Sequence, residues 1–355
     1  MIRVVAMTPY PQGQVPGQRY RIEQWAPLLR KEGIEIVFSP FLSRRAMDVL
    51  YQPGHLVRKI EGMVQGYLKR WAEVLRRNPA DLVFVYREAA LLGPAIFERL
   101  LAKRMPLVLD FDDAIYLRDT SRANAWIRVL KAKWKTQTIC QLASHVTVGN
   151  EFLAQFASRH ARAVTVVPST IDTDLYEVRP RPANPRPVVG WSGSATTLAH
   201  LRALAPVLRR LRERQDFEFR VIGGELQMDG VPVCCKPWRP DTEVEDVREF
   251  DVGVMPLADD EWSRGKCGLK ALQYMALGIP PVVSPVGVNA AIVEDGVSGF
   301  HARTEDEWVD RMTLLLRDRQ LRRALGDEAR KTVETRFSAK CQVPRMAQVI
   351  REAAR

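Results

Sequence analysis

Cationic side chains flank a glycine-rich helix start in the segment GKCGLKALQYMALGIPPVVSPVG, Gly265–Gly287. Gly268 frees the backbone where the helix begins, and the unpaired N–H groups of a helix start carry about half a positive charge. Lys266 and Lys270 add full charges, and Leu269 lies in the same turn. The pattern predicts a site for a phosphate or a diphosphate. A plain amphipathic helix with surface lysines is the alternative.

The same helix has a predictable inward face. Its apolar residues recur with helical spacing from Leu269 to Ile279, which predicts one buried face. We expect Lys270, Gln273 and Tyr274 on the solvent side, with Gln273 able to bond a sugar hydroxyl. Glycine and two prolines then end the helix before a buried strand, PVVS.

Gly13 and Gly17 lie in a loop that follows a strand and precedes a helix. Glycines let a ligand approach the backbone, and Arg19 and Arg21 supply cations that recognise anions. A turn that merely connects the strand to the helix, with exposed arginines, explains the same residues. The sequence leaves both interpretations open.

Aspartates close a buried strand in LDFDDAIY. Side chains at the carboxyl end of a parallel strand lie where such sheets bind ligands, so Asp112 and Asp113 are candidates for chemistry. Capping of the next helix is the alternative role. Asn150 follows another strand, in HVTVGNEFL, where a helix N-cap accounts for it and a ligand contact is the second interpretation.

Several classes of site are absent from the sequence. There is no GxGxxG fingerprint and no GKS/T loop, which disfavours nicotinamide and Walker-type phosphate chemistry. The five cysteines are odd in number and lack CxxC spacing, so neither a disulfide framework nor a zinc site is expected. No apolar stretch approaches about eighteen residues, and the N-terminus lacks the apolar segment of a secretory signal. These features favour a cytoplasmic protein.

The formal net charge of +11 predicts an anionic partner, unless the whole proteome is basic. Between Arg44 and Arg77 there are eight cations and three acids, with apolar residues at helical spacing over 55–77. That helix could rest on anionic lipid or turn its apolar stripe toward a sheet. A second basic stretch runs from Trp126 to Lys135. Nucleic acid is not expected, because helix-turn-helix and aromatic-platform signatures are missing.

Strands rich in Val, Ile and Leu alternate with helices, which predicts parallel sheets covered on both faces. The proline-rich segment RPRPANPRP, residues 179–187, predicts a linker between two similar halves. Strands are expected at 3–7, 34–38, 81–86, 106–111, 145–149, 163–168, 187–191, 217–223, 251–257 and 280–284. Helices of the first half are expected at 18–32, 55–77, 89–104, 122–143 and 150–159.

Four phrases resemble glycosyltransferase family 4, which has retaining, nucleotide-sugar-dependent enzymes of the GT-B fold. KCGLKALQYMALGIPPVVSPVG is similar to the family's central motif, and VNAAIVEDGVSGF to the phrase after it. DVGVMPL and VVPSTIDTDLY resemble two further family phrases. The resemblance implies two Rossmann-like, doubly wound α/β domains facing across a cleft. They are an acceptor domain over 1–178, a linker over 179–187 and a donor domain over 188–339, with a last helix at about 340–355 crossing back.

The resemblance also implies roles for individual residues. The family's His-Asp pair falls on Asp112 and Asp113, which would be catalytic. The motif acid that holds the donor ribose falls on Gln273, and the acid that contacts the donor sugar falls on Gly265, which leaves Gly265 and Asn150 as sugar or acceptor contacts. The family's diphosphate-clamping Arg and Lys are missing from GWSGSATT. Their role would pass to Lys266, Gly268, Leu269, Lys270, Ser192, Gly193 and Ser194, with Gly13, Gly17 and Arg19 as a second ligand loop.

The implied activity is a hexosyltransferase-like transfer (EC 2.4) from a nucleoside-diphosphate sugar to a hydroxyl of a lipid-linked, lipopolysaccharide or polysaccharide acceptor. No metal or other cofactor is expected, because lysines and a helix start supply positive charge. The DFD triplet matches a DxD metal motif only superficially, since the surrounding pattern is doubly wound. The expected place is the cytoplasm, with a peripheral position on the cytoplasmic membrane face as a further hypothesis. A non-catalytic nucleotide-sugar-binding protein is the alternative, because both motif acids are replaced.

Overall fold

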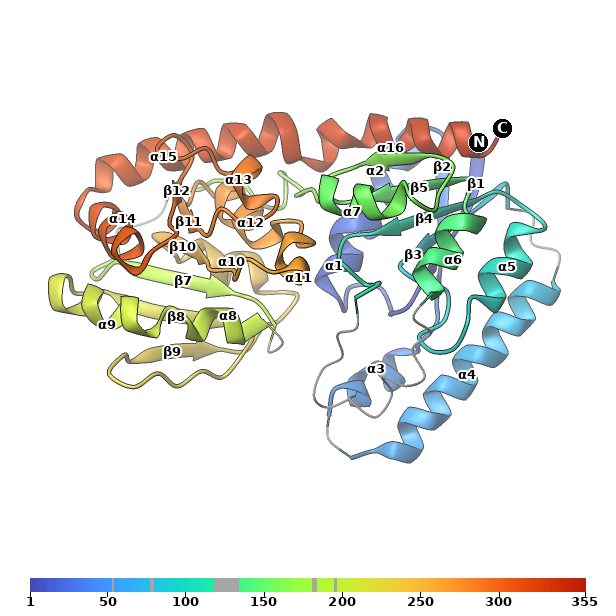
Figure 1. The fold of residues 1–355 in the computed structure, drawn as a ribbon, viewed down its shortest axis with the longest axis horizontal. Helices are drawn as coiled ribbons and strands as arrows, with labels where there is room; N and C mark the ends of the chain where they lie inside the picture. The colour runs from blue at the N-terminus through green and yellow to red at the C-terminus, as the bar shows by residue number, and fades with distance from the viewer. Residues whose placement is uncertain (53, 77–79, 118–133, 181–183, 195–196) are drawn as a thin grey trace. The chain divides into compact units, whose positions relative to one another are not determined.

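The computed structural model describes residues 1–52, 54–76, 80–117, 134–180, 184–194 and 197–355. The chain divides into two compact units, Met1–Ser169 with Gln342–Arg355, and Thr170–Cys341. Each unit contains a six-stranded parallel sheet with helices packed on it (Figure 1), so the predicted α/β class is confirmed. Most of the second basic stretch, up to residue 133, lies outside the described residues.

The strands of the first unit are the six that the sequence predicts. Their order is β2-β1-β3-β4-β5-β6, and each neighbouring pair is parallel. Three of the inner strands are buried along their whole length, as expected for apolar strands covered on both faces. The bounds are β1 (Ile2–Thr8), β2 (Ile34–Pro40), β3 (Leu82–Tyr86), β4 (Leu107–Phe111), β5 (His145–Val148) and β6 (Val164–Val166).

The helices of the first unit depart from prediction in several places. The helix expected over 18–32 is divided into three short segments. The helix expected over 122–143 lies outside the described residues up to residue 133. A short helix over Arg44–Leu50 was not expected, and the helix expected from residue 89 begins only at Ile96. Gly93, with φ +75°, and Pro94 keep the preceding segment from being helical. The helical segments are α1 (Pro16–Gln18), the π-helical η1 (Arg19–Glu23), α2 (Ala26–Lys31), α3 (Arg44–Leu50), α4 (Leu56–Leu75), α5 (Ile96–Ala102), α6 (Lys135–Leu142) and α7 (Glu151–Ala157).

The sheet of the second unit has the order β12-β11-β10-β7-β8-β9, again with parallel neighbours. Its two edge strands were not predicted, because one has only two residues and the other, VCCK, is largely exposed and lacks the apolar run of the inner strands. The bounds are β7 (Val188–Ser192), β8 (Glu218–Ile222), β9 (Val233–Lys236), β10 (Val252–Met255), β11 (Pro281–Val283) and β12 (Phe300–His301).

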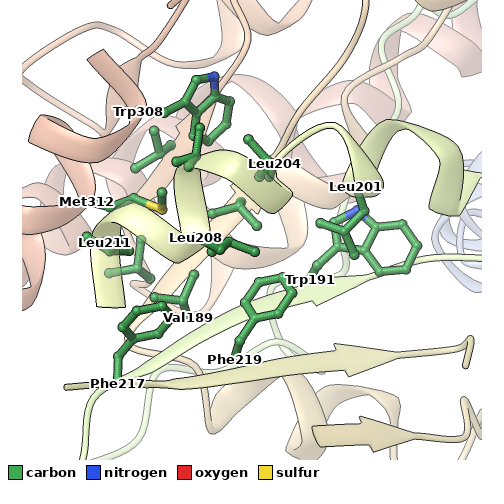
Figure 2. Packing of buried hydrophobic residues seen from close by; sticks show 14 of the residues in the cluster. Val189, Trp191, Leu201, Leu204, Leu208, Leu211, Phe217, Phe219, Trp308 and Met312 are labelled. Atoms are coloured by element: carbon green, nitrogen blue, oxygen red, sulfur yellow. The ribbon is translucent and has the colours of Figure 1, made fainter. Parts of the chain in front are cut away.

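The core of the second unit lies between its sheet and the helices packed on one face. Figure 2 shows Leu208 and Leu211 packed against Phe219 of β8 and against Phe217, which directly precedes that strand. Trp308 lies on a neighbouring helix. The helical segments are α8 (Leu198–Arg202), α9 (Ala205–Arg214), α10 (Glu243–Arg248), α11 (Glu261–Arg264), α12 (Leu269–Ala276), α13 (Asn289–Ile292), α14 (Glu305–Arg317), α15 (Arg319–Thr332) and the π-helical η4 (Val333–Phe337). The last helix, α16 (Ala339–Ala353), begins in the second unit and belongs to the first unit from Gln342 onward.

The unit boundary differs from the expected one. Residues 170–178 group with the second unit, where Ile171 pairs with Ser338 and Tyr176 is fully buried. Residues from Gln342 onward group with the first unit, where Arg351 donates a hydrogen bond of 2.7 Å to the backbone oxygen of Glu32.

Each sheet reverses its winding once, and open parallel sheets bind ligands at the carboxyl ends of the strands beside such a reversal. In the first unit, β1 leads outward to β2, while β3 lies on the opposite side of β1. In the second unit, β7 leads to β8, while β10 lies on its other side. Ligands are therefore expected at the loops after β1 and β3 in the first unit, and at the loops after β7 and β10 in the second unit.

The buried face of helix α4 carries few large apolar side chains. Its buried residues are Gly62, Gly66, Arg70 and Val74, and a Cβ at Gly66 would lie 2.7 Å from the ring of Phe41. The apolar stripe is turned to solvent instead of to the sheet, so the sheet-facing alternative is wrong. Its exposed members are Leu56, Val57, Ile60, Val64, Leu68, Trp71 and Leu75.

Arg70 anchors α4 to the strand ends of the first unit. Its guanidinium donates to the backbone oxygens of Thr8 (3.2 Å), Ser39 (2.8 Å) and Ala89 (2.7 Å). It also forms an ion pair of 2.7 Å with Glu73. Burial is the largest influence on the Arg70 guanidinium and lowers its pKa. Saturation of its donors offsets the cost of burying the charge.

Among the described helices, none is both long enough and apolar enough to cross a membrane.

Candidate functional site

The first turn of α12 is built around Gly268. This residue has φ +68°, a left-handed conformation that favours glycine, and a Cβ there would collide with the Ile292 side chain. Both the backbone conformation and the lack of space for a side chain therefore require glycine at the helix start. Nearby, Asn289 is buried, and its Oδ1 has no hydrogen-bond partner among the described residues. That oxygen lies 3.4 Å from where a Gly268 Cβ would stand.

Two predicted cations lie against tryptophan rings at this turn. Lys266 Nζ is 4.4 Å from the centroid of Trp262, and Lys270 Nζ is 5.4 Å from the centroid of Trp191. A Cβ at Gly193 would lie 2.7 Å from Lys270 Cε and 2.6 Å from the Trp191 ring. The structure thus brings the end of β7 and the start of α12 together.

His200 on α8 joins this group and was missed from the sequence. Burial is the largest cause of its lowered pKa, and the charges of Lys270 and Lys266 lower it further against an opposing effect of Asp260. His200 therefore lies within the positive field of both lysines. No local sequence pattern identifies His200 as a neighbour of the lysines, because α8 and α12 are far apart in the chain.

Ser192 and Ser194 flank Gly193 at the end of β7. The backbone N–H of Ser192 donates to the Tyr274 hydroxyl at 3.0 Å, and the backbone oxygen of Ser194 accepts from Thr197 at 2.9 Å. Gln273 was expected on the solvent side but is buried, and the same prediction is wrong for Tyr274. Its ring fills the space above Gly253 and is fully buried, which raises its pKa. A glycine on the adjacent strand makes room for this ring, which helical periodicity does not reveal.

The two motif-acid positions have different surroundings. Gln273 is only 4% exposed, and its Nε2 donates to Tyr176 Oη at 2.8 Å and to Glu243 Oε1 at 3.0 Å. Gly265 is the C-cap of α11, with an ordinary φ of −74°. The side chain of Asp260 caps the other end of that helix. The Gln273 contacts place an unpredicted carboxylate, Glu243, beside the motif position.

A second group of polar side chains meets at the carboxyl ends of β1, β3 and β4 in the first unit. Asp112 Oδ1 accepts from Tyr86 Oη at 2.9 Å and from Arg87 Nη2 at 2.7 Å. Asp113 Oδ2 is 3.9 Å from the same Arg87 nitrogen. Gly17 adjoins the group, since a Cβ there would lie 2.5 Å from Tyr86 Oη. The structure therefore brings the glycine loop and the aspartate pair together.

Arg87 is the residue of this group that the sequence did not reveal. It has φ +61°, which is uncommon for a residue with a side chain and is typical of strained functional positions. Burial alone would raise the pKa of Asp112, but the charges of Arg87 and Arg21 outweigh it and lower the pKa. Asp112 is accordingly a carboxylate at neutral pH. It can accept a hydrogen bond from a hydroxyl but is poorly suited to donate a proton.

Arg21 has a structural role, which differs from both interpretations that the sequence left open, an anion-recognising arginine and an exposed one. It is fully buried and forms a two-point ion pair with Asp110, which is also fully buried, with Arg21 Nε 3.0 Å from Asp110 Oδ2. Burial raises the pKa of Asp110, and Arg21 opposes that rise. Arg19, by contrast, lies with its guanidinium carbon 5.5 Å from the Tyr20 ring centroid. Gly13 has φ +80°, and its N–H donates to Glu23 at 2.8 Å.

Asn150 is the N-cap of α7, where its Oδ1 accepts from the backbone N–H of Leu153 at 2.9 Å. The structural explanation for this residue is therefore sufficient. Within the described part of the chain, no three His, Cys, Asp or Glu side chains lie together in a way that could hold a metal ion.

Residues 186–318, which include Gly268, the lysines beside it and Gln273, match the family Glycosyl transferases group 1. The match lies within the second unit. No curated protein is significantly similar to the chain in sequence.

Solved structures share the fold of the chain over nearly its whole length. Sucrose-phosphate synthase from Thermosynechococcus elongatus is 14% identical, with a TM-score of 0.70 and 99% of each chain covered. A glycosyltransferase from Rickettsia africae is 13% identical, with a TM-score of 0.69 over 99% of this chain and 98% of that one. Anabaena HepE, solved with UDP and glucose, is 16% identical, with a TM-score of 0.67 over 99% and 100%. The chain therefore has the GT-B fold.

Proposed function

We propose that the protein transfers a sugar, with retention, from a nucleoside-diphosphate sugar to a hydroxyl of a lipid-linked, lipopolysaccharide or polysaccharide acceptor. The second unit would bind the donor and the first unit the acceptor. The single observation that carries the proposal is the group at the start of α12, where Gly268, Lys266 and Lys270 lie beside the end of β7 inside the segment that matches the family.

The donor half rests on charge. A diphosphate carries negative charge that two lysines and a helix start can neutralise together. Burial is the largest cause of the lowered pKa of His200, and the charges of Lys270 and Lys266 lower it further. UDP is the first nucleotide to try, because Anabaena HepE binds UDP in its solved complex.

The mechanism would rely on stabilising the departing diphosphate. The bond from the sugar's anomeric carbon to the diphosphate oxygen breaks while the acceptor oxygen forms its bond on the same face. The acceptor's proton passes to the leaving phosphate oxygen. Lys266, Lys270 and the N–H groups of α12 would carry the charge that develops, in place of a metal ion.

The acceptor half rests on Asp112. Its carboxylate is held by Tyr86 and Arg87 and remains ionised, so it would orient an acceptor hydroxyl by accepting its hydrogen bond. Asp113, on the other side of Arg87, would assist. Gly13, Gly17 and Arg19 would line the same loop.

A lipid-linked acceptor agrees with the outward apolar stripe of α4. Leu68 is 64% exposed and Val57 is 79% exposed. Arg44, Arg45, Arg58 and Arg76 lie on α3 and α4 or next to α4, and they make no ion pair with another described residue. Apolar side chains beside unpaired cations suit the surface of an anionic membrane. We therefore propose peripheral binding on a cytoplasmic membrane face.

The proposal is tested by following sugar release and transfer from UDP-, GDP- and ADP-sugars, with lipid-linked acceptors supplied in detergent. Turnover of one donor supports the enzyme. Tight binding of a donor with no turnover on any acceptor would instead support a non-catalytic nucleotide-sugar-binding protein. Asp112→Asn should slow transfer while leaving nucleotide affinity unchanged, because Asp112 belongs to the first unit.

A further inference from the structure

The amide of Gln273 has a defined orientation. Its nitrogen has two hydrogens, and it donates to Tyr176 Oη at 2.8 Å and to Glu243 Oε1 at 3.0 Å. A carboxylate accepts hydrogen bonds and cannot donate them, so the amide edge facing Glu243 must be the nitrogen. The planar amide then directs Oε1 away from Glu243.

Glu243 is placed to hold this arrangement. It is the first residue of α10, is 2% exposed, and reaches α12 across the second unit. Both helices follow loops at the carboxyl edge of the same sheet, which is the edge where a parallel sheet binds its ligand. Tyr176 is fully buried at the second contact, and its backbone oxygen accepts from Arg330. The amide therefore has firm partners on two sides.

The replacement of the motif glutamate by Gln273 gains an explanation from this geometry. A glutamate presents only acceptor oxygens to a ribose, whereas an unrestrained glutamine can present either its oxygen or its NH₂ group. We propose that Glu243 is a positioning residue that fixes the Gln273 amide with its oxygen toward the donor ribose, so that the glutamine acts as an acceptor there. The inference rests on the proposed donor site of the second unit.

The proposal predicts that the two side chains can be exchanged. Gln273→Glu alone would put two carboxylates about 3 Å apart, which disfavours ionisation of one of them. Glu243→Gln alone would remove the group that determines the amide orientation. The double variant Gln273→Glu with Glu243→Gln would restore one donor facing one acceptor, with the carboxylate now at the motif position.

The readout is discrimination between a nucleoside diphosphate and its 2′-deoxy counterpart, measured by calorimetry with UDP, GDP and ADP. For the nucleotide that binds, we expect the wild type to prefer the ribose form about tenfold or more. Each single variant should bring that preference to about twofold, and the double variant should return it to within about threefold of wild type. A purely structural role for Glu243 would change thermal stability without changing this ratio.

Glu245→Gln on the same helix is the matched control, because Glu245 is exposed and pairs with Arg248. It should leave the ratio unchanged. If a nucleotide binds with ribose preference and Glu243→Gln retains that preference, the positioning role is overturned while the proposed donor site stands. If no nucleoside diphosphate binds the wild type, the donor site itself fails, and this inference fails with it.

Discussion

Gly17 lies so close to the Asp112 carboxylate that a Cβ atom at position 17 would stand 2.9 Å from Asp112 Oδ2. The two residues come from loops after different strands and have no relation in local sequence. The absence of a side chain at Gly17 is what lets Asp112, Tyr86 and Arg87 form one hydrogen-bonded group. The glycine loop and the aspartate pair are thus one structural feature.

Gly17→Ala should disrupt this hydrogen-bonded group, which belongs to the first unit. The added methyl would displace the Tyr86 hydroxyl and the Asp112 carboxylate, at a cost of about 1–3 kcal/mol in the free energy of unfolding. We expect transfer to fall about tenfold or more, because a misplaced orienting group is costly. Transfer kinetics and nucleotide calorimetry on the same preparation check both expectations.

Gly13→Ala is the control from the same loop. A Cβ at Gly13 would meet nothing within 4 Å, but its φ of +80° would strain an alanine. This variant should lose about 1 kcal/mol of stability and keep more activity than Gly17→Ala. Equal losses of activity would show that loop strain, and not contact with Asp112, explains the effect.

Lys270→Met should weaken binding of a nucleoside diphosphate and spare binding of the nucleoside. Loss of a charged hydrogen bond costs about 1.5–3 kcal/mol, so the UDP affinity should drop about ten- to a hundredfold. Methionine can still pack against Trp191, which lies under the lysine. Uridine and UDP titrations measure the two parts separately.

Lys331→Met provides a matched control, because Lys331 is exposed on α15 and pairs only with surface Glu328 in the described structure. Its UDP affinity should equal that of the wild type. A Lys270→Met protein with unchanged UDP affinity would remove Lys270 from the phosphate site, and Lys266→Ala would then be the variant to measure.

His200 should make stability fall as the solution becomes acidic. Burial and the two lysines hold its pKa below the ordinary value in the folded protein, whereas unfolding returns it to about 6.5. The unfolded state therefore binds the proton more readily, so this contribution is present above about pH 6.5 and is lost as the pH falls through the lower folded pKa. His200→Gln should show a shallower loss of stability between about pH 7 and 5, measured by urea unfolding. An identical slope in both proteins would argue against the assigned environment.

The outward stripe of α4 should control binding to anionic vesicles. Val64→Ser with Leu68→Ser removes two exposed apolar side chains, each worth about 1 kcal/mol on partial immersion in lipid. Binding to phosphatidylglycerol vesicles in a sedimentation assay should weaken about tenfold or more, with folding stability nearly unchanged.

Leu314→Ser, at an exposed leucine of the second unit, is the control and should bind vesicles like the wild type. Phosphatidylcholine vesicles test the contribution of charge, and the wild type should bind them more weakly. Equal binding of wild type and the α4 double variant to phosphatidylglycerol would exclude this helix as the docking surface.

Much of the fold could be read from local patterns. Runs of Val, Ile and Leu between helical segments predict parallel strands because both faces of such a sheet are covered, and the longer strands all appear where expected. Gly268 and Gly278 were predicted at the two ends of α12, and both have positive φ. A chain that turns at a helix end needs a left-handed conformation at one residue, and glycine adopts that conformation readily. The sequence alone therefore determined this part of the site.

Tertiary structure decided which side chains meet and which face of an element is covered. Arg21 and Arg87 are both arginines of the first unit, yet Arg21 is buried with Asp110 and Arg87 pairs with Asp112. The apolar stripe of α4 has clear helical spacing, but the buried face of the helix is the one that carries its glycines. Periodicity therefore indicates an apolar face without showing which residues cover it. Glu243 lies 30 residues from Gln273 in sequence and 3.0 Å from it in space. Such pairings depend on how loops return to one sheet edge, and no local pattern records that path.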